Sequence, residues 1–218
     1  MVALSSASAE VRSLVGEAAS AAADLIARPE VSAQWDEPSA LDGMTVGALA
    51  AHLLRATGAT IAYLERTDPN EQPACPDDLL TSISYFRAAL EAPIHDRIKE
   101  VSAAESEPGA SELAAKAASL ASSLGPRLLE EPGDRMIAAL EGRMLTLDDF
   151  CRTRLIEITM HIDDLAASVH VEPPTIDGAA DVVIGILTGI ARDRHGDRGV
   201  IAALGRAERA PDNVFPVF

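Results

Sequence analysis

Residues 147–169 read LDDFCRTRLIEITMHIDDLAASV, and this stretch decides the fold. Large apolar side chains recur in it every three or four residues, the spacing that aligns them on one face of an α-helix. That apolar stripe consists of Leu155, Ile158, Ile162, Leu165 and Val169. Thr146 directly precedes the stretch and, with Asp149 three residues on, resembles a capping motif at a helix start. The sequence therefore predicts a long amphipathic helix that packs against other helices.

Further segments with the same period flank this helix. They are residues 8–27, 46–66, 77–104, 111–131 and 177–194, with a short helix over 198–206. Pro29 is expected to end the first segment, and Pro93 is expected to break the third. Residues 135–147 are expected to form a short hairpin or extended loop. Long amphipathic helices with short connections favour an antiparallel arrangement, so we expect an all-α four-helix bundle with additional C-terminal helices.

Composition narrows the range of functions. The chain has 218 residues and is 48% hydrophobic, enough for one sizeable core, so residues 1–218 are expected to form a single domain. Its net charge of −16 argues against a nucleic-acid partner and against an anionic membrane surface. The longest apolar run, residues 182–191, is too short to span a bilayer. No signal peptide is evident, so Cys75 and Cys151 are expected to be free thiols in the cytoplasm.

Three side chains suggest a metal site. Glu157 and His161 are four residues apart, so a helix places them one turn apart and pointing the same way, beside the apolar stripe. His52 has a similar position in the segment 46–66. Two imidazoles and one carboxylate suit Zn²⁺, and also Fe²⁺, Ni²⁺ or Mn²⁺, and three protein ligands leave one position open. Zinc is the preferred ion, and Asp164 is expected to orient His161.

Other readings of these residues stay open at the level of sequence. A Glu and a His four apart are common on solvated helix faces, and nothing in the spacing shows that the two segments touch. Arg87, Arg154 and Tyr63 are candidate anchors for an acidic substrate or cofactor. For Arg154 the alternative is an ion pair with Glu157, and for Tyr63 it is packing inside the bundle.

Two motifs carry a resemblance to a known family. The stretches 35–39, WDEPS, and 43–54, GMTVGALAAHLL, resemble the first metal-ligand region of the DinB-like superfamily. Residues 152–165, RTRLIEITMHIDDL, resemble the second region, in which a Glu and a His four apart precede Asp-Leu. The branch that the chain most resembles is named for mycothiol-dependent maleylpyruvate isomerase. The resemblance implies a DinB-like four-helix bundle with a divalent metal, often zinc.

The resemblance also implies a ligand set and a reaction class. The ligands would be His52, Glu157 and His161, and the cofactor would be a low-molecular-weight thiol, mycothiol. We expect a metal-dependent thiol S-transferase or isomerase that acts on a small electrophilic substrate. Only about a dozen residues follow Arg206, fewer than the additional C-terminal domain of the isomerase, so another thiol-transfer reaction fits as well.

Two alternatives to this reaction class remain. The first is a metal-dependent hydrolase that uses metal-bound water on the same three residues. The second is a non-enzymatic binding or stress-associated helical bundle. The expected partners are the thiol and the electrophile, and a homodimer is left open. No catalytic residue beyond the ligands is assigned.

Overall fold

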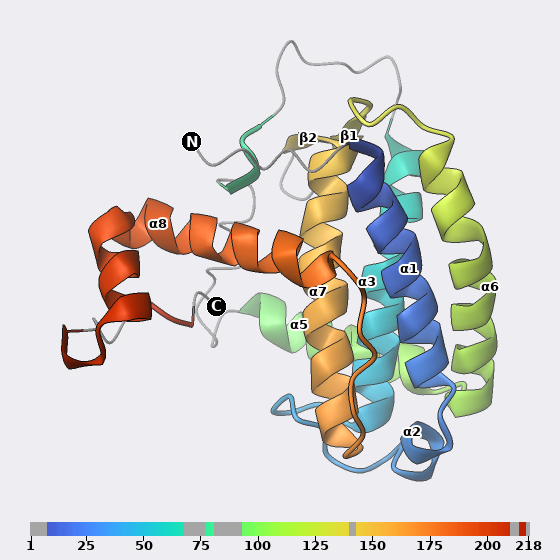
Figure 1. Cartoon of the computed structure of the whole chain (residues 1–218). Helices are drawn as coiled ribbons and strands as arrows, with labels where there is room; N and C mark the ends of the chain where they lie inside the picture. Colours follow the sequence, from blue (N-terminus) through green and yellow to red (C-terminus); the bar gives the residue numbers. More distant parts are fainter. Residues whose placement is uncertain (1–7, 68–76, 81–92, 140–142, 210–213, 217–218) are drawn as a thin grey trace.

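The computed structural model describes residues 8–67, 77–80, 93–139, 143–209 and 214–216 (Figure 1). Within these ranges, four long helices lie side by side as a bundle. They are α1 (Ser8–Ile26), α3 (Val46–Arg66), α6 (Ala110–Leu129) and α7 (Leu147–Ser168). Helix α1 packs against α6 and α7, and α3 packs against α7 and α6, so the four enclose a common core. The all-α bundle that the sequence predicts is confirmed.

Small residues allow α1 and α6 to approach each other closely. A Cβ atom on Gly16 of α1 would lie 2.8 Å from the Cα atom of Gly125 in α6, closer than real contacts allow. Several alanines of α1 are also buried. They include Ala18, Ala19 and Ala22. Small residues where α1 faces α6 therefore allow the two helix backbones to lie close together.

Threonine caps begin the two helices that carry the candidate ligands. Thr45 accepts a hydrogen bond from the backbone N–H of Ala48 at 3.1 Å, and Thr146 accepts one from Asp149 at 3.1 Å. These bonds satisfy backbone donors that the first helical turn leaves without partners. Both helix starts agree with the expectation from the sequence.

A short antiparallel hairpin leads directly into α7. Its strands are β1 (Met136–Ala138) and β2 (Met144–Thr146). Ile137 pairs with Leu145, and both side chains are buried, which fixes the hairpin against the end of the bundle. The hairpin predicted over residues 135–147 is thereby confirmed.

The first half of the chain contains one short helix that the sequence does not predict. Helix α2 (Pro29–Ala33) follows α1, where the sequence suggests only a loop. Proline suits the first position of a helix because its missing N–H would have no partner there. Pro29 therefore ends one helix and starts another. Helix α5 (Pro93–Ser106) likewise begins at the proline expected to break the third predicted helix, of which residues 81–92 lie outside the description.

The last helical segment consists of two helices that meet at a kink, in agreement with the two helices predicted over 177–194 and 198–206. Helix α8 (Ala179–Gly205) contains one kink at Gly196, with φ 70° and ψ 162°, and η3 (Ala207–Arg209) follows it. In Figure 1, α8 starts beside α7 and projects away from the bundle. The additional C-terminal helices are thus present, merged across the kink. Across the described helices, none is both long enough and apolar enough to cross a membrane.

Candidate metal centre

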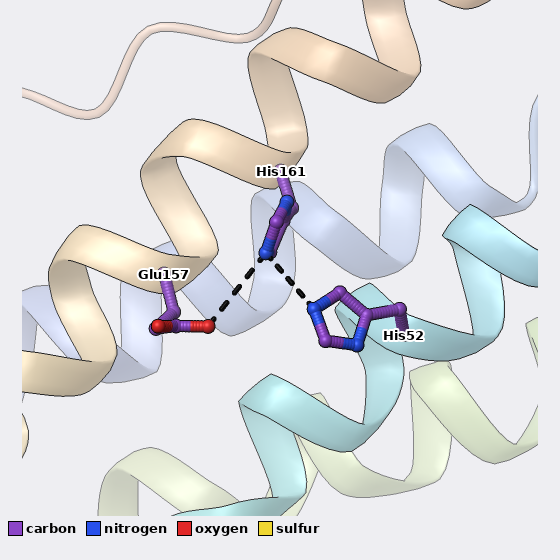
Figure 2. Close-up of side chains that lie close together, drawn as sticks. All are labelled: His52, Glu157 and His161. Carbon is purple, nitrogen blue, oxygen red and sulfur yellow. Dashed lines mark hydrogen bonds and ion pairs between the residues drawn. The ribbon is translucent and has the colours of Figure 1, made fainter. Parts of the chain in front are cut away.

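His52 of α3 meets Glu157 and His161 of α7 (Figure 2). The Nε2 atoms of the two imidazoles are 3.0 Å apart, and Glu157 Oε2 lies 3.6 Å from Nε2 of His161. One ligand atom from each residue lies within 4.8 Å of the others. The direct packing of α3 on α7 therefore brings together residues more than a hundred positions apart in the sequence.

The apolar stripes of the two helices place these side chains at the edge of the core. Leu49 and Leu53 flank His52 on α3 and are buried, as are Ile158 and Ile162 on α7. Glu157 and His161 lie just beside that stripe, with side chains 15% and 16% exposed. The cluster is therefore largely shielded from water yet reachable from one side.

The donor set fits a single divalent ion. Ligand bonds of about 2.1 Å put two ligand atoms of one tetrahedral ion roughly 3–4 Å apart. The separations of 3.0 and 3.6 Å around Nε2 of His161 fall in that range. The two rings meet edge to face, with an interplanar angle of 70°. Among the residues that the structure describes, no second cluster of this kind occurs.

Asp164 orients the ring of His161. Its Oδ2 atom lies 3.0 Å from Nδ1 of His161, one turn further along α7. A carboxylate only accepts hydrogen bonds, so it keeps a hydrogen on Nδ1 and directs Nε2 of the neutral ring toward the cluster. The structure thus shows the contact that the sequence predicts for Asp164.

Burial and charge act in opposite directions on the two histidines. Burial, followed by the nearby charge of His161, lowers the pKa of His52 to about 3. Burial would also lower the pKa of His161, but the hydrogen bond with Asp164 and the carboxylate of Glu157, 3.6 Å away, raise it to about 9. Positive charge in this pair is therefore favoured on His161, beside the carboxylates.

Glu157 remains ionised in this setting. Burial raises the pKa of its carboxyl group, but the nearby ring of His161 and the charge of Arg154 outweigh it, and the pKa is lowered. An ionised carboxylate and a neutral His52 are the forms that a metal ion requires.

Arg55 is a neighbour of the cluster that the sequence reasoning missed. Its Nη2 atom lies 2.8 Å from Nδ1 of His52, and its other contacts are with Ser102 and Glu105 of α5. One clue to this contact is present in the sequence. Arg55 follows His52 by three residues, so a helix places both side chains on one face. The contacts of Arg55 with α5 cannot be predicted from residue spacing.

Of the three candidate anchors for an acidic substrate or cofactor, the structure describes two, Arg154 and Tyr63. Arg87 lies outside the described residues. Arg154 donates from Nε to Thr153, and its guanidinium carbon lies 5.3 Å from the ring centroid of Phe150, in place of the ion pair with Glu157 that the spacing suggests.

Tyr63 belongs to the packing of the bundle. Its ring centroid lies 5.0 Å from that of Phe150, and the guanidinium of Arg66 lies 3.5 Å over its ring. Tyr63 follows His52 by eleven residues, which corresponds to about 16 Å along the helix axis. These contacts show Tyr63 packed in the bundle, and an anchoring role for a ligand stays a prediction.

Cys151 does not contribute a reactive thiol to the cluster. The side chain is fully buried, and burial raises its pKa to about 12. A thiol with so high a pKa stays protonated at neutral pH, so it acts as a packed apolar side chain.

Comparison with known proteins agrees with this architecture. Residues 15–166 match the family described as the mycothiol maleylpyruvate isomerase N-terminal domain. The match covers most of the chain, which therefore belongs to this mycothiol-related family of DinB-like helical bundles. It includes α3 and α7, and hence His52, Glu157 and His161, whereas α8 lies beyond it. No curated protein and no solved structure matches the chain.

Proposed function

We propose that His52, Glu157 and His161 bind one divalent ion, zinc, and that the protein is a mycothiol-dependent S-transferase or isomerase for a small electrophile. The convergence of the three ligand atoms between α3 and α7 carries this proposal. Membership of a mycothiol-related family supports the choice of thiol. The net charge of −16 supports small molecules rather than nucleic acid as partners, and we propose a cytoplasmic location.

The reaction depends on an open coordination position. A zinc ion held by three protein ligands would accept a thiol as its fourth ligand and lower the pKa of that thiol. The residues present favour this use, because one carboxylate and two neutral imidazoles leave a net positive charge on the loaded site. Such a site favours an anionic thiolate over a neutral ligand.

The surrounding side chains prepare this site. Asp164 keeps a hydrogen on Nδ1 of His161 and so directs Nε2 toward the ion. Leu53 and Ile158 pack beside the ligands and exclude water from one side. Arg154, whose charge already acts on Glu157, is proposed to attract an acidic group of the thiol or the electrophile.

Thiol-dependent turnover tests the proposal. Zinc-loaded protein would be assayed with a panel of small electrophiles, with and without mycothiol. We expect turnover only when zinc and mycothiol are both present, and we expect His52→Ala to abolish it. The matched control is His170→Ala, which changes an exposed histidine at the end of α7. Turnover without the thiol would instead favour the hydrolase, and absence of both metal and turnover would favour a non-enzymatic bundle.

A further inference from the structure

The hydrogen-bond network around Arg55 fixes the position of the hydrogen on His52. A guanidinium group has donors only. Nη2 of Arg55 lies 2.8 Å from Nδ1 of His52 and 2.9 Å from Oγ of Ser102, so its two hydrogens have one acceptor each. Oγ of the buried Ser102 donates its own hydrogen to the carbonyl of Ile98 at 2.7 Å. Nδ1 of His52 is therefore an acceptor, and the single hydrogen of the neutral ring is on Nε2.

This arrangement is incompatible with metal binding through the same ring. A metal ion at Nε2 of His52 needs the lone pair of that atom, which moves the ring hydrogen to Nδ1. Nδ1–H would then face the N–H donors of Arg55 across 2.8 Å. Two donors at that distance repel each other, so the Arg55 contact and metal binding at His52 exclude each other.

The two histidines of the cluster thus differ in their readiness for a metal. Above its pKa of about 9, His161 has its hydrogen on Nδ1, donated to Asp164, and its Nε2 lone pair is available. His52 has the opposite tautomer because of Arg55. Without a metal, Nε2–H of His52 can donate to the Nε2 lone pair of a neutral His161 at 3.0 Å.

We propose that Arg55 is a positioning residue that sets the metal affinity of this site by competing with the ion for His52. This inference rests on the metal site of the proposed function. Helix α5 makes the exchange feasible, because Glu105 accepts from the other guanidinium nitrogen, Nη1, at 2.7 Å. The guanidinium can therefore move away from His52 while it keeps its ion pair.

Zinc affinity of two charge-matched variants tests the proposal. Arg55→Met and Arg154→Met each remove one positive charge that lowers the pKa of His52, but only the first removes the donor at Nδ1. Affinity would be measured by chelator competition at pH 10, above the pKa of His161, so that both imidazoles are neutral. We expect Arg55→Met to bind zinc about 10- to 100-fold more tightly than Arg154→Met. Equal affinities of the two folded variants would overturn the inference.

A measurement on the unmodified chain guards against a folding defect in the variants. Nitrogen-15 NMR of the imidazoles at pH 10 reports which nitrogen carries the hydrogen. We expect His52 to have it on Nε2 in the metal-free protein and on Nδ1 after zinc is added. A hydrogen on Nδ1 of His52 in the metal-free protein would contradict the proposal. Zinc binding in neither the unmodified chain nor any variant would overturn the metal site and, with it, this inference.

Discussion

Asp164 and His161 are joined by a hydrogen bond of 3.0 Å that turns the imidazole toward His52. The bond lies within one turn of α7, so it needs no contact with another helix. It leaves Nε2 of His161 as the meeting point of the cluster, 3.0 Å from His52 and 3.6 Å from Glu157. The geometry of a three-ligand site therefore follows from one local contact and one helix pairing.

Replacing Asp164 with asparagine should weaken metal binding. The amide keeps the shape of the side chain but removes the charge that holds the hydrogen on Nδ1 of His161. We expect Asp164→Asn to lower zinc affinity about tenfold, measured by competition with a chromophoric chelator. Asp163→Asn is the matched control, because Asp163 is exposed on the same helix. An equal loss in both variants would indicate a general charge effect rather than orientation of His161.

Zinc affinity should rise with pH up to about pH 9. The hydrogen bond with Asp164 and the carboxylate of Glu157 hold a proton on His161 up to that pH, against the effect of burial, and a metal ion must displace it. We expect up to about a tenfold gain in affinity per pH unit between pH 7 and pH 9. A flat profile in buffered zinc would contradict the raised pKa of His161.

Stability of the metal-free protein should fall over the same pH range. The pKa of His161 is about 9 in the folded chain and 6.5 as an unperturbed value, so the folded state holds its proton more tightly. The stabilisation is complete below pH 6.5 and is lost as the pH rises through 9. The lowered pKa of His52 acts only below pH 6.5, outside this window. The melting temperature of the unmodified chain should therefore drop more between pH 7 and pH 10 than that of His161→Gln, and parallel curves would argue against this assignment.

Two glycine substitutions should have opposite effects on the bundle. Gly16→Ala would force a methyl group to within 2.8 Å of the Gly125 backbone, and we expect a loss of about 1–3 kcal/mol in the free energy of unfolding. Gly58→Ala would place its methyl 3.4 Å from a side-chain carbon of Leu120, an ordinary contact. Because alanine is the better helix former, that change should stabilise the chain by up to about 1 kcal/mol. Denaturant unfolding of both variants checks the pair, and similar losses would contradict the close approach of α1 and α6.

Local patterns were sufficient to predict most of the helices. The 3.6-residue period predicts α1, α3, α6 and α7, and the caps at Thr45 and Thr146 follow from the preference of helix starts for hydroxyl side chains. The hairpin before α7 was also predictable, because residues 135–147 interrupt the helical period. Helix α2 was missed because Pro29 was taken only as a helix end. The break predicted between residues 194 and 198 is confirmed, because the backbone at Gly196 leaves the helical conformation and divides α8 into two helices.

The candidate site was predictable only in part. Glu157 and His161 share a helix face, so their proximity follows from spacing alone. The arrival of His52 depends on how α3 packs against α7, which no local pattern encodes, and it was expected only from the resemblance to a family. Arg55 lies within one turn of His52, yet its role depends on Ser102 and Glu105, which α5 supplies from about fifty residues away. Contacts between helices that are far apart in the sequence are therefore not predictable from local sequence patterns.

Anomalous X-ray diffraction at the zinc edge, from crystals of the zinc-loaded protein, tests the central claim most directly. We predict one peak about 2.1 Å from Nε2 of His52, Nε2 of His161 and a carboxylate oxygen of Glu157, with a non-protein ligand in the remaining position. A peak elsewhere, or an ion enclosed by four protein ligands, would contradict the claim that these three residues form an open metal site.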